Sequence, residues 1–133
     1  RLLNQAGYRT IIISNQPGVA RGAMTQSDLD DIHQHMVGDA ELAGGRIDGA
    51  FYCTHDWDEG CWCRKPNPGM LFQAQRKHHL DLSRTIFFGD DERDGQAAKA
   101  AGCPWVQITE TNSLLSATTN LLAQNLQMGH PTG

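Results

Sequence analysis

The segment TIFFGDDERDGQAAKAAG, residues 85–102, decides the fold class of this 133-residue chain. Thr85–Phe88 is a short run of β-branched and aromatic residues, which is typical of a buried strand. The acidic turn Gly89–Asp91 follows it. Asp94–Ala101 is rich in alanine and predicts a helix, which Gly102 closes. A strand that leads through a polar turn into a helix is the repeating unit of α/β proteins.

The same alternation of strand and helix recurs along the rest of the chain. The other strands that we expect are residues 8–14, 47–53 and 103–108, and the other helices are residues 26–43, 69–79 and 113–126. Residues 1–7 have the pattern of the last turns of a helix that ends at a glycine. This order predicts an α/β fold with a mainly parallel sheet that is flanked by helices.

Composition argues against several classes of protein. The formal net charge is −4, whereas a nucleic-acid-binding protein usually carries a basic surplus. Hydrophobic residues make up 39% of the chain, as is ordinary for a globular protein. No apolar run approaches the roughly 20 residues that a membrane helix needs. We therefore expect a cytoplasmic protein that binds neither nucleic acid nor membranes.

Four metal-ligating side chains lie close together in the pattern C-T-H-x5-C-W-C. They are Cys53, His55, Cys61 and Cys63. Three thiolates and one imidazole suit tetrahedral zinc, and four protein ligands leave no open position for water. The pattern therefore predicts a zinc ion that holds the loop and takes no part in hydrolysis. The alternatives are reduced cysteines without a metal, or a disulfide between Cys53 and Cys61.

Three expected strand ends carry polar residues that suit phosphate chemistry. The first strand ends at Ser14–Asn15, the second leads into Cys53–Lys65, and Thr85–Phe88 leads into Asp90–Asp91. Ligands of parallel α/β sheets bind at the carboxyl ends of the strands. We therefore expect these residues to converge on one active site.

Each of these residues also has an ordinary explanation. Carboxylates at Asp90 and Asp91 suit a hard cation such as Mg²⁺, but acids at a helix start also cap the helix. Lys65 lies beside a proline-fixed turn and is a candidate phosphate anchor, although most lysines are simply solvated. Ser14 and Asn15 can bind a phosphate oxygen, and both also favour turns.

Three longer segments carry a resemblance to a known family. They are SNQPGVARG (14–22), CTHDWDEGCWCRKPNPGM (53–70) and FFGDDERDGQAAKAAG (87–102). In this order they closely resemble the haloacid dehalogenase superfamily, and within it the branch of the heptose bisphosphate and histidinol phosphatases. The resemblance spans residues 1–110 and implies a Rossmann-like fold with a zinc-binding loop insertion. It predicts one hydrolase domain over residues 1–127, followed by a frayed tail over 128–133.

The resemblance also implies roles for single residues. Ser14 and Asn15 would hold the phosphoryl group of the substrate. Lys65 would neutralise charge on a phosphoaspartate intermediate. Asp90 would bind Mg²⁺, with Asp94 as its supporting acid, and the cysteine and histidine cluster would bind Zn²⁺.

One motif of the superfamily is absent from the chain. Its first strand carries D-x-D-G-T or D-x-D-G-V, in which the first aspartate is the nucleophile and the second is the general acid and base. Asp28–Asp30 and Asp56–Asp58 have the D-x-D spacing. The first pair lies in an expected helix. The second lies in the metal loop, the irregular segment that follows Cys53 and contains the other three candidate zinc ligands. Neither precedes Gly-Thr. We therefore expect the missing first strand upstream of Arg1, because the chain opens with residues typical of a helix end.

The activity that we expect is hydrolysis of a small phosphorylated metabolite. NQPGVARG and RKPNPGM are more similar to the heptose bisphosphate group, which implies the 7-phosphate of D-glycero-D-manno-heptose 1,7-bisphosphate, a lipopolysaccharide precursor, as substrate. Arg64 would then read the second phosphate. A histidinol phosphate, another small phosphomonoester, or a non-catalytic zinc-binding fragment are the alternatives. The complete protein is expected to be a monomer.

The absent motif provides a direct test. The 133-residue chain alone should not turn over heptose bisphosphate, because electrostatic groups cannot replace a positioned nucleophile. Adding roughly 30 to 50 upstream residues, the length of one strand and a crossover helix, should give Mg²⁺-dependent phosphate release. Robust turnover by the chain alone would show that the nucleophile has been misassigned.

Overall fold

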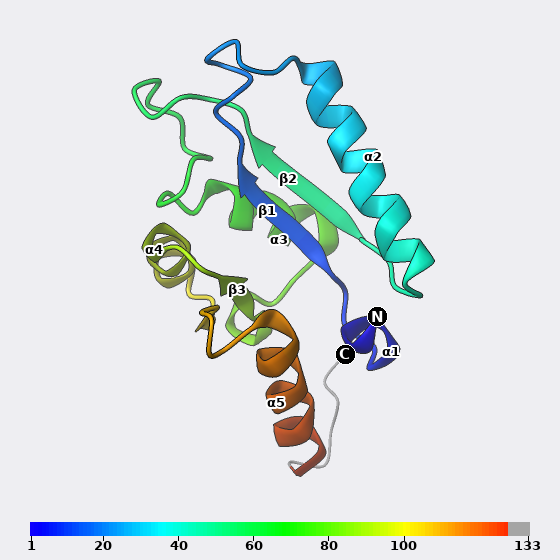
Figure 1. Cartoon of the computed structure of the whole chain (residues 1–133). Helices are drawn as coiled ribbons and strands as arrows, with labels where there is room; N and C mark the ends of the chain where they lie inside the picture. The colour runs from blue at the N-terminus through cyan, green and yellow to red at the C-terminus, as the bar shows by residue number, and fades with distance from the viewer. Residues whose placement is uncertain (128–133) are drawn as a thin grey trace. The chain divides into compact units, whose positions relative to one another are not determined.

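The computed structural model describes residues 1–127, which divide into two compact units (Figure 1). Unit 1 comprises Arg1–Glu59 and the residues from Leu122 onward, and unit 2 comprises Gly60–Leu121. Each unit contains one parallel pair of strands, so the described residues form two two-stranded sheets. The prediction of parallel strands flanked by helices is confirmed. The expected tail, 128–133, lies outside the described residues.

Unit 1 is built on the parallel pair of strands β1 (Ile11–Asn15) and β2 (Gly49–Cys53). Helix α2 (Gln26–Leu42) connects the two strands and runs beside them (Figure 1). The register places Asn15 opposite Cys53. An expected phosphate contact and an expected zinc ligand therefore leave the same end of the strand pair.

Helix α2 is fixed at its start and along its length. Thr25 Oγ1 accepts the Asp28 N–H at 3.0 Å, and the Asp28 carboxylate accepts the Thr25 N–H at 2.9 Å. This reciprocal capping satisfies two backbone donors at the helix start and lowers the pKa of Asp28. Further along, His33 Nδ1 lies 2.9 Å from the Tyr52 hydroxyl, with the two rings edge to face. Leu29 is buried on the same helix.

Strand β1 is shorter than the sequence pattern predicts, because side chains take over its hydrogen bonds. The expected strand begins at Tyr8, but the observed strand begins at Ile11. Before it, the Thr10 N–H donates to the Asp48 carboxylate at 2.8 Å. The Thr10 hydroxyl donates to the Arg46 carbonyl.

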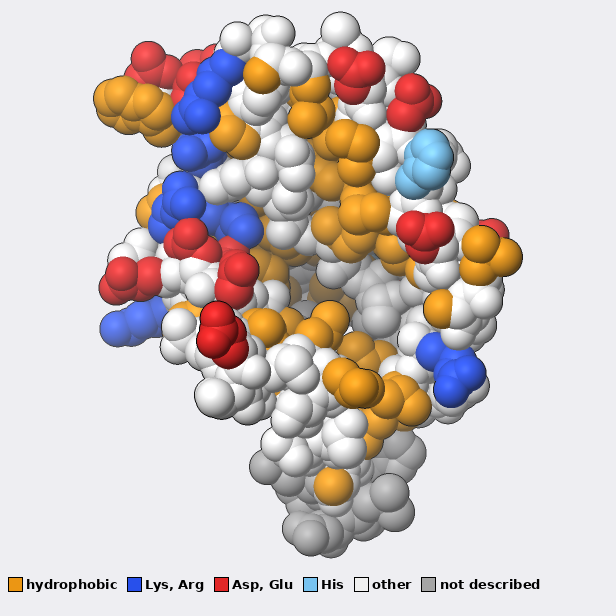
Figure 2. All heavy atoms as spheres, viewed as in Figure 1, with side chains coloured by type: hydrophobic (Ala, Val, Ile, Leu, Met, Phe, Trp, Pro, Cys, Tyr) orange, Lys and Arg blue, Asp and Glu red, His pale blue; other side chains and the backbone are white. Residues whose placement is uncertain are grey.

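The strand pair of unit 1 keeps an apolar surface that is only partly covered. All residues of β1 are partly exposed, and β1 pairs with β2 alone within the described residues. Figure 2 shows hydrophobic side chains gathered at the surface over this strand pair. None of the described helices is long and apolar enough to cross a membrane.

Unit 2 alternates helices with its own parallel strand pair. Its elements are α3 (Gly69–His78), a 3₁₀ turn η1 (Leu82–Arg84), β3 (Phe87–Gly89), α4 (Glu92–Ala101) and β4 (Trp105–Gln107), and α5 (Leu114–Gln127) follows. Strand β4 begins later than expected because Pro104 has no N–H to donate to a ladder. Helix α4 begins two residues before its expected start, because Asp91 caps it.

Helix α4 packs very closely on strand β4 at a glycine. A Cβ atom added at Gly95 would lie 2.5 Å from ring carbons of Trp105. No side chain fits at that distance, so the indole packs directly on the helix backbone. Helices α3 and α4 also contribute buried side chains to the core of unit 2. These are Met70, Leu71 and Ala74 of α3, and Ala97 and Ala98 of α4.

This close approach predicts opposite effects of one substitution at two helical glycines. Gly95→Ala should lower the free energy of unfolding by about 1–3 kcal/mol, because the new methyl group overpacks the contact with Trp105. Gly38→Ala in α2 should raise it by about 0.5–1 kcal/mol, because nothing lies within 4 Å of the added Cβ and alanine favours helix. Urea unfolding curves of both variants check this. Equal effects at the two positions would contradict the packing.

Candidate functional site

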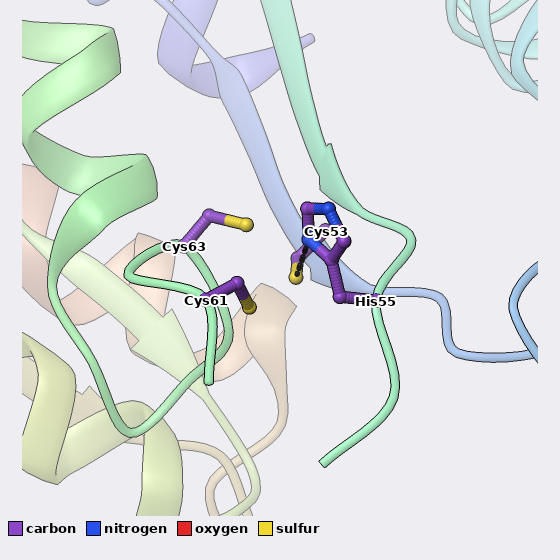
Figure 3. Close-up of side chains that lie close together, drawn as sticks. All are labelled: Cys53, His55, Cys61 and Cys63. Atoms are coloured by element: carbon purple, nitrogen blue, oxygen red, sulfur yellow. Dashed lines mark hydrogen bonds between the residues drawn. The ribbon is translucent and has the colours of Figure 1, made fainter. Parts of the chain in front are cut away.

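The four predicted zinc ligands gather at one point of their loop. The ligand atoms of Cys53, His55, Cys61 and Cys63 all lie within 4.8 Å of one another (Figure 3). Cys53 Sγ lies 3.5 Å from His55 Nδ1. Tetrahedral zinc with Zn–S bonds near 2.3 Å separates its sulfurs by about 3.8 Å, so small side-chain rotations suffice to surround one ion. No disulfide joins cysteines among the described residues, so the alternative Cys53–Cys61 disulfide is not formed.

The loop reaches this geometry through its backbone. After Cys61, the Asn67 amide donates to the Cys61 carbonyl at 3.1 Å, and the Gly69 N–H donates to the Trp62 carbonyl at 3.2 Å. A Cβ at Gly69 would lie 2.4 Å from that carbonyl oxygen, so only glycine allows this approach. The loop carries two strongly exposed indoles, because Trp57 is 73% and Trp62 is 64% exposed.

A buried ion pair forms where β3 ends. The Lys65 ammonium pairs with the Asp94 carboxylate, and their side chains are 15% and 6% exposed. The Asp94 carboxylate also accepts the Asp91 N–H at 3.2 Å. Gly89 makes room for this arrangement, because a Cβ there would lie 2.3 Å from Asp94 Oδ2. The structure therefore brings Lys65 and Asp94 together at one strand end.

The two neighbouring acids Asp90 and Asp91 have different surroundings. Asp91 caps α4, because its carboxylate accepts the Arg93 N–H at 2.8 Å and forms an ion pair with the guanidinium at 2.9 Å. Hydrogen bonds from the Arg93 side chain and backbone lower the pKa of Asp91 to about 2. Asp90 is exposed and makes no hydrogen bond or ion pair within residues 1–127. The capping alternative thus describes Asp91, and Asp90 stays the candidate Mg²⁺ ligand.

The remaining candidates lie at the β1 end and beside Lys65. Ser14 Oγ accepts a hydrogen bond from Gln16 Nε2 at 3.0 Å. Arg64 Nη1 is buried and has no hydrogen-bond partner among the described residues, which suits an anionic ligand. Ser14 belongs to unit 1, and Arg64, Lys65 and Asp90 belong to unit 2. Their convergence on one phosphate stays a prediction.

The sequence pattern does not single out one further interaction of the metal loop. Arg21 and Asp56 form an ion pair at 2.8 Å, although 35 residues separate them. The sequence offers one hint of this ion pair, because Arg21 lies in the segment after β1 and Asp56 lies in the segment after β2. Only the strand register shows that these segments meet.

Comparisons with known proteins agree with this fold. Residues 62–119 match the protein family described as “HAD-hyrolase-like”. The chain is 42% identical over 108 residues to the D-glycero-beta-D-manno-heptose-1,7-bisphosphate 7-phosphatase of Bordetella bronchiseptica, over 80% of this chain and 60% of that protein. It is 32% identical to the D-glycero-alpha-D-manno-heptose-1,7-bisphosphate 7-phosphatase of Photorhabdus laumondii, over 93% of this chain and 73% of the relative.

A solved structure gives the same result. The crystal structure of D,D-heptose 1,7-bisphosphate phosphatase from B. bronchiseptica, complexed with magnesium and phosphate, matches with a TM-score of 0.85 and 34% identity. The match covers 92% of this chain and 78% of that chain. These matches identify a hydrolase of the haloacid dehalogenase type. The chain belongs to this family, as the resemblance predicts. It spans about three fifths of the length of the Bordetella relative, whose matched share is 60%.

The metal cluster predicts about one zinc ion per chain. Elemental analysis of protein purified without chelator should find it, and Cys61→Ser should weaken zinc binding by more than the roughly 10- to 100-fold that loss of a supporting residue costs. Cys103→Ser is the control, because burial raises the pKa of that thiol to about 11 and it lies outside the cluster. Zinc-free wild-type protein would contradict the site.

Substitution of Asp94 and of Asp90 should have different effects on the free energy of unfolding. Asp94→Ala should lower the free energy of unfolding by about 3 kcal/mol, because it leaves the Lys65 ammonium without its buried partner. Asp90→Ala should change it by less than about 0.5 kcal/mol, because the Asp90 side chain is exposed. Chemical denaturation of both variants gives the comparison. A similar loss in both would mean that Asp90 is part of the packed structure.

Proposed function

We propose that this protein is a Mg²⁺-dependent phosphatase that removes the 7-phosphate of D-glycero-D-manno-heptose 1,7-bisphosphate. The observation that carries the proposal is the ion pair of Lys65 with buried Asp94 at the end of β3, the strand that the exposed Asp90 directly follows. The relatives named above support the choice of substrate. A metabolite with two phosphates also suits the two neighbouring cations Arg64 and Lys65, which directly follow Cys63.

The charges at the β3 end suit phosphoryl transfer. Lys65 would neutralise negative charge on the transferring group, and Asp94 would fix the direction of its ammonium. The Asp90 carboxylate is an oxygen donor of the kind that Mg²⁺ prefers, and its exposure leaves it able to bind the ion. Bound Mg²⁺ would supply further stabilisation of the phosphoryl oxygens.

Polar groups nearby would bind the substrate. Ser14 and Asn15, at the end of β1, would contact the phosphoryl oxygens. The buried and unsatisfied Nη1 of Arg64 would bind the second phosphate of the sugar. Zinc in the cysteine–histidine loop would have a structural role, because four protein ligands exclude a bound water. The protein would act in the cytoplasm on a small phosphorylated sugar, and its net charge of −4 disfavours a nucleic-acid partner.

A non-catalytic zinc-binding module is the second candidate. It is favoured by one observation, namely that the 133 residues contain no D-x-D followed by Gly-Thr or Gly-Val. Such a module would bind zinc and phosphate without turnover. The two candidates differ in whether an N-terminal segment that carries this motif restores activity.

The proposal is tested by phosphate release from heptose 1,7-bisphosphate and from histidinol phosphate, with the chain joined to a segment that carries the motif. Asp90→Asn should reduce the rate about 100- to 1000-fold and leave zinc bound, because a charged group that stabilises the transition state is lost. Glu92→Gln, an exposed acid at the start of α4, is the matched control and should stay near the wild-type rate. Faster turnover of histidinol phosphate would reassign the substrate, and no turnover of either would favour the zinc module.

A further inference from the structure

Two loops leave the same end of the β1–β2 pair, and one ion pair joins them. The first loop follows Asn15, which lies opposite Cys53 in the strand register. The Gln16 N–H donates to the Cys53 carbonyl at 2.7 Å and keeps the two chain segments together at their start. The second loop is the metal loop that begins at Cys53. Arg21 of the first loop and Asp56 of the second meet further out.

The first loop is closed on itself and can act as one body. The Arg21 N–H donates to the Pro17 carbonyl at 3.0 Å, and the Ala23 N–H donates to the Gly18 carbonyl at 2.9 Å. Gly22 has a φ of +73°, a conformation that glycine adopts without strain and that turns the chain directly after the arginine. These hydrogen bonds tie the backbone of Arg21 to Pro17, two residues after the end of β1.

The contact between the loops is a two-pronged ion pair. Arg21 Nε donates to Asp56 Oδ2 at 2.9 Å, and Nη2 donates to Oδ1 at 2.8 Å. The hydrogen bonds to Asp56 raise the pKa of the Arg21 guanidinium. The planar fork fixes direction as well as distance, which a lysine at this position cannot do. Exposed pairs add little to global stability, so any effect of this pair is local.

Asp56 also shapes the metal loop directly. It follows the zinc-ligand candidate His55 in the chain. Its Oδ1 accepts the Trp57 N–H at 2.7 Å, and its carbonyl accepts the Glu59 N–H at 3.2 Å. One residue thus turns the chain after the histidine and holds the arginine of the other loop.

We propose that Arg21 and Asp56 form a positioning clamp, which couples order in the metal loop to the loop that follows Ser14 and Asn15. The clamp holds the chain around His55 in the geometry that binds zinc. Zinc in turn fixes Asp56, and through Arg21 it fixes the segment next to the candidate phosphate contacts. The phosphate half of this inference rests on the proposed function, whereas the zinc half does not.

The first test measures the rate at which the zinc-loaded 133-residue chain gives up its metal to a chelator. Arg21→Gln and Asp56→Asn should each release zinc about 10-fold faster, as expected for a residue that supports a ligand. Asn at position 56 keeps an oxygen that can accept the Trp57 N–H, so that variant keeps this contact and removes the charge that pairs with Arg21. Arg21→Lys should lie between, and the double variant Arg21→Gln with Asp56→Asn should release zinc no faster than the single variants, because all three lack the same ion pair.

A second ion pair in unit 1 provides the matched control. Arg46 and Asp48 pair at 2.7 Å with side chains 53% and 20% exposed, against 50% and 21% for Arg21 and Asp56. Arg46→Gln should leave zinc release unchanged. Faster release in this control to the same extent, wild-type release in Arg21→Gln, or additive acceleration in the double variant would each overturn the clamp.

Amide hydrogen exchange over residues 16–24 tests the coupling. Zinc should slow exchange of these amides in the wild-type chain and have little effect on them in Arg21→Gln. Equal protection by zinc in both proteins would overturn the coupling. Neither readout needs turnover, so a failed phosphatase assay contradicts the proposed function and leaves the clamp to be judged on zinc release and exchange.

Discussion

Parallel pairing of strands places the functional side chains in each unit. Parallel strands point the same way, so the segments that follow them start at a common edge. In unit 1 this edge holds Asn15 beside Cys53. The loop next to the candidate phosphate contacts begins after Asn15, and the metal loop begins at Cys53. In unit 2 the end of β3 delivers Asp90 and Asp91, and α4 starts immediately afterwards. Neither arrangement needs a long loop, because the strand register already sets where each side chain begins.

Close backbone packing at glycines then determines where charge can be buried. Asp94 lies against the backbone of β3 because Gly89 has no side chain, and this position allows it to meet Lys65. A buried carboxylate without a partner would be costly, so the pair has to form as a unit. The result is a fixed ammonium group at the end of β3, the strand that the exposed Asp90 directly follows.

The sequence predicts the parts of this structure that depend on local pattern. Ligand spacing within eleven residues is local, which is why the cysteine–histidine cluster could be recognised before the fold was known. The residues alone left open which of Asp90 and Asp91 caps α4, because this depends on β3 ending at Gly89 and not one residue earlier. The link from Arg21 to Asp56 depends on strand register across 35 residues, and no local pattern encodes it. Strands β1 and β4 begin later than the sequence predicts for a related reason. The Asp48 side chain accepts the Thr10 N–H before β1, and Pro104 has no N–H to donate before β4.

The two exposed indoles of the metal loop give the protein an intrinsic optical signal. The chain has three tryptophans, and two of them, Trp57 and Trp62, lie within the loop and are largely in water. Their fluorescence therefore emits at the long wavelengths typical of solvated indole, whereas Trp105 reports on the packed contact with α4. Unfolding of the α4–β4 contact moves Trp105 into water and shifts its emission to longer wavelengths, whereas Trp57 and Trp62 already emit there. The emission spectrum of the unmodified protein thus reports unfolding of this contact without any added dye.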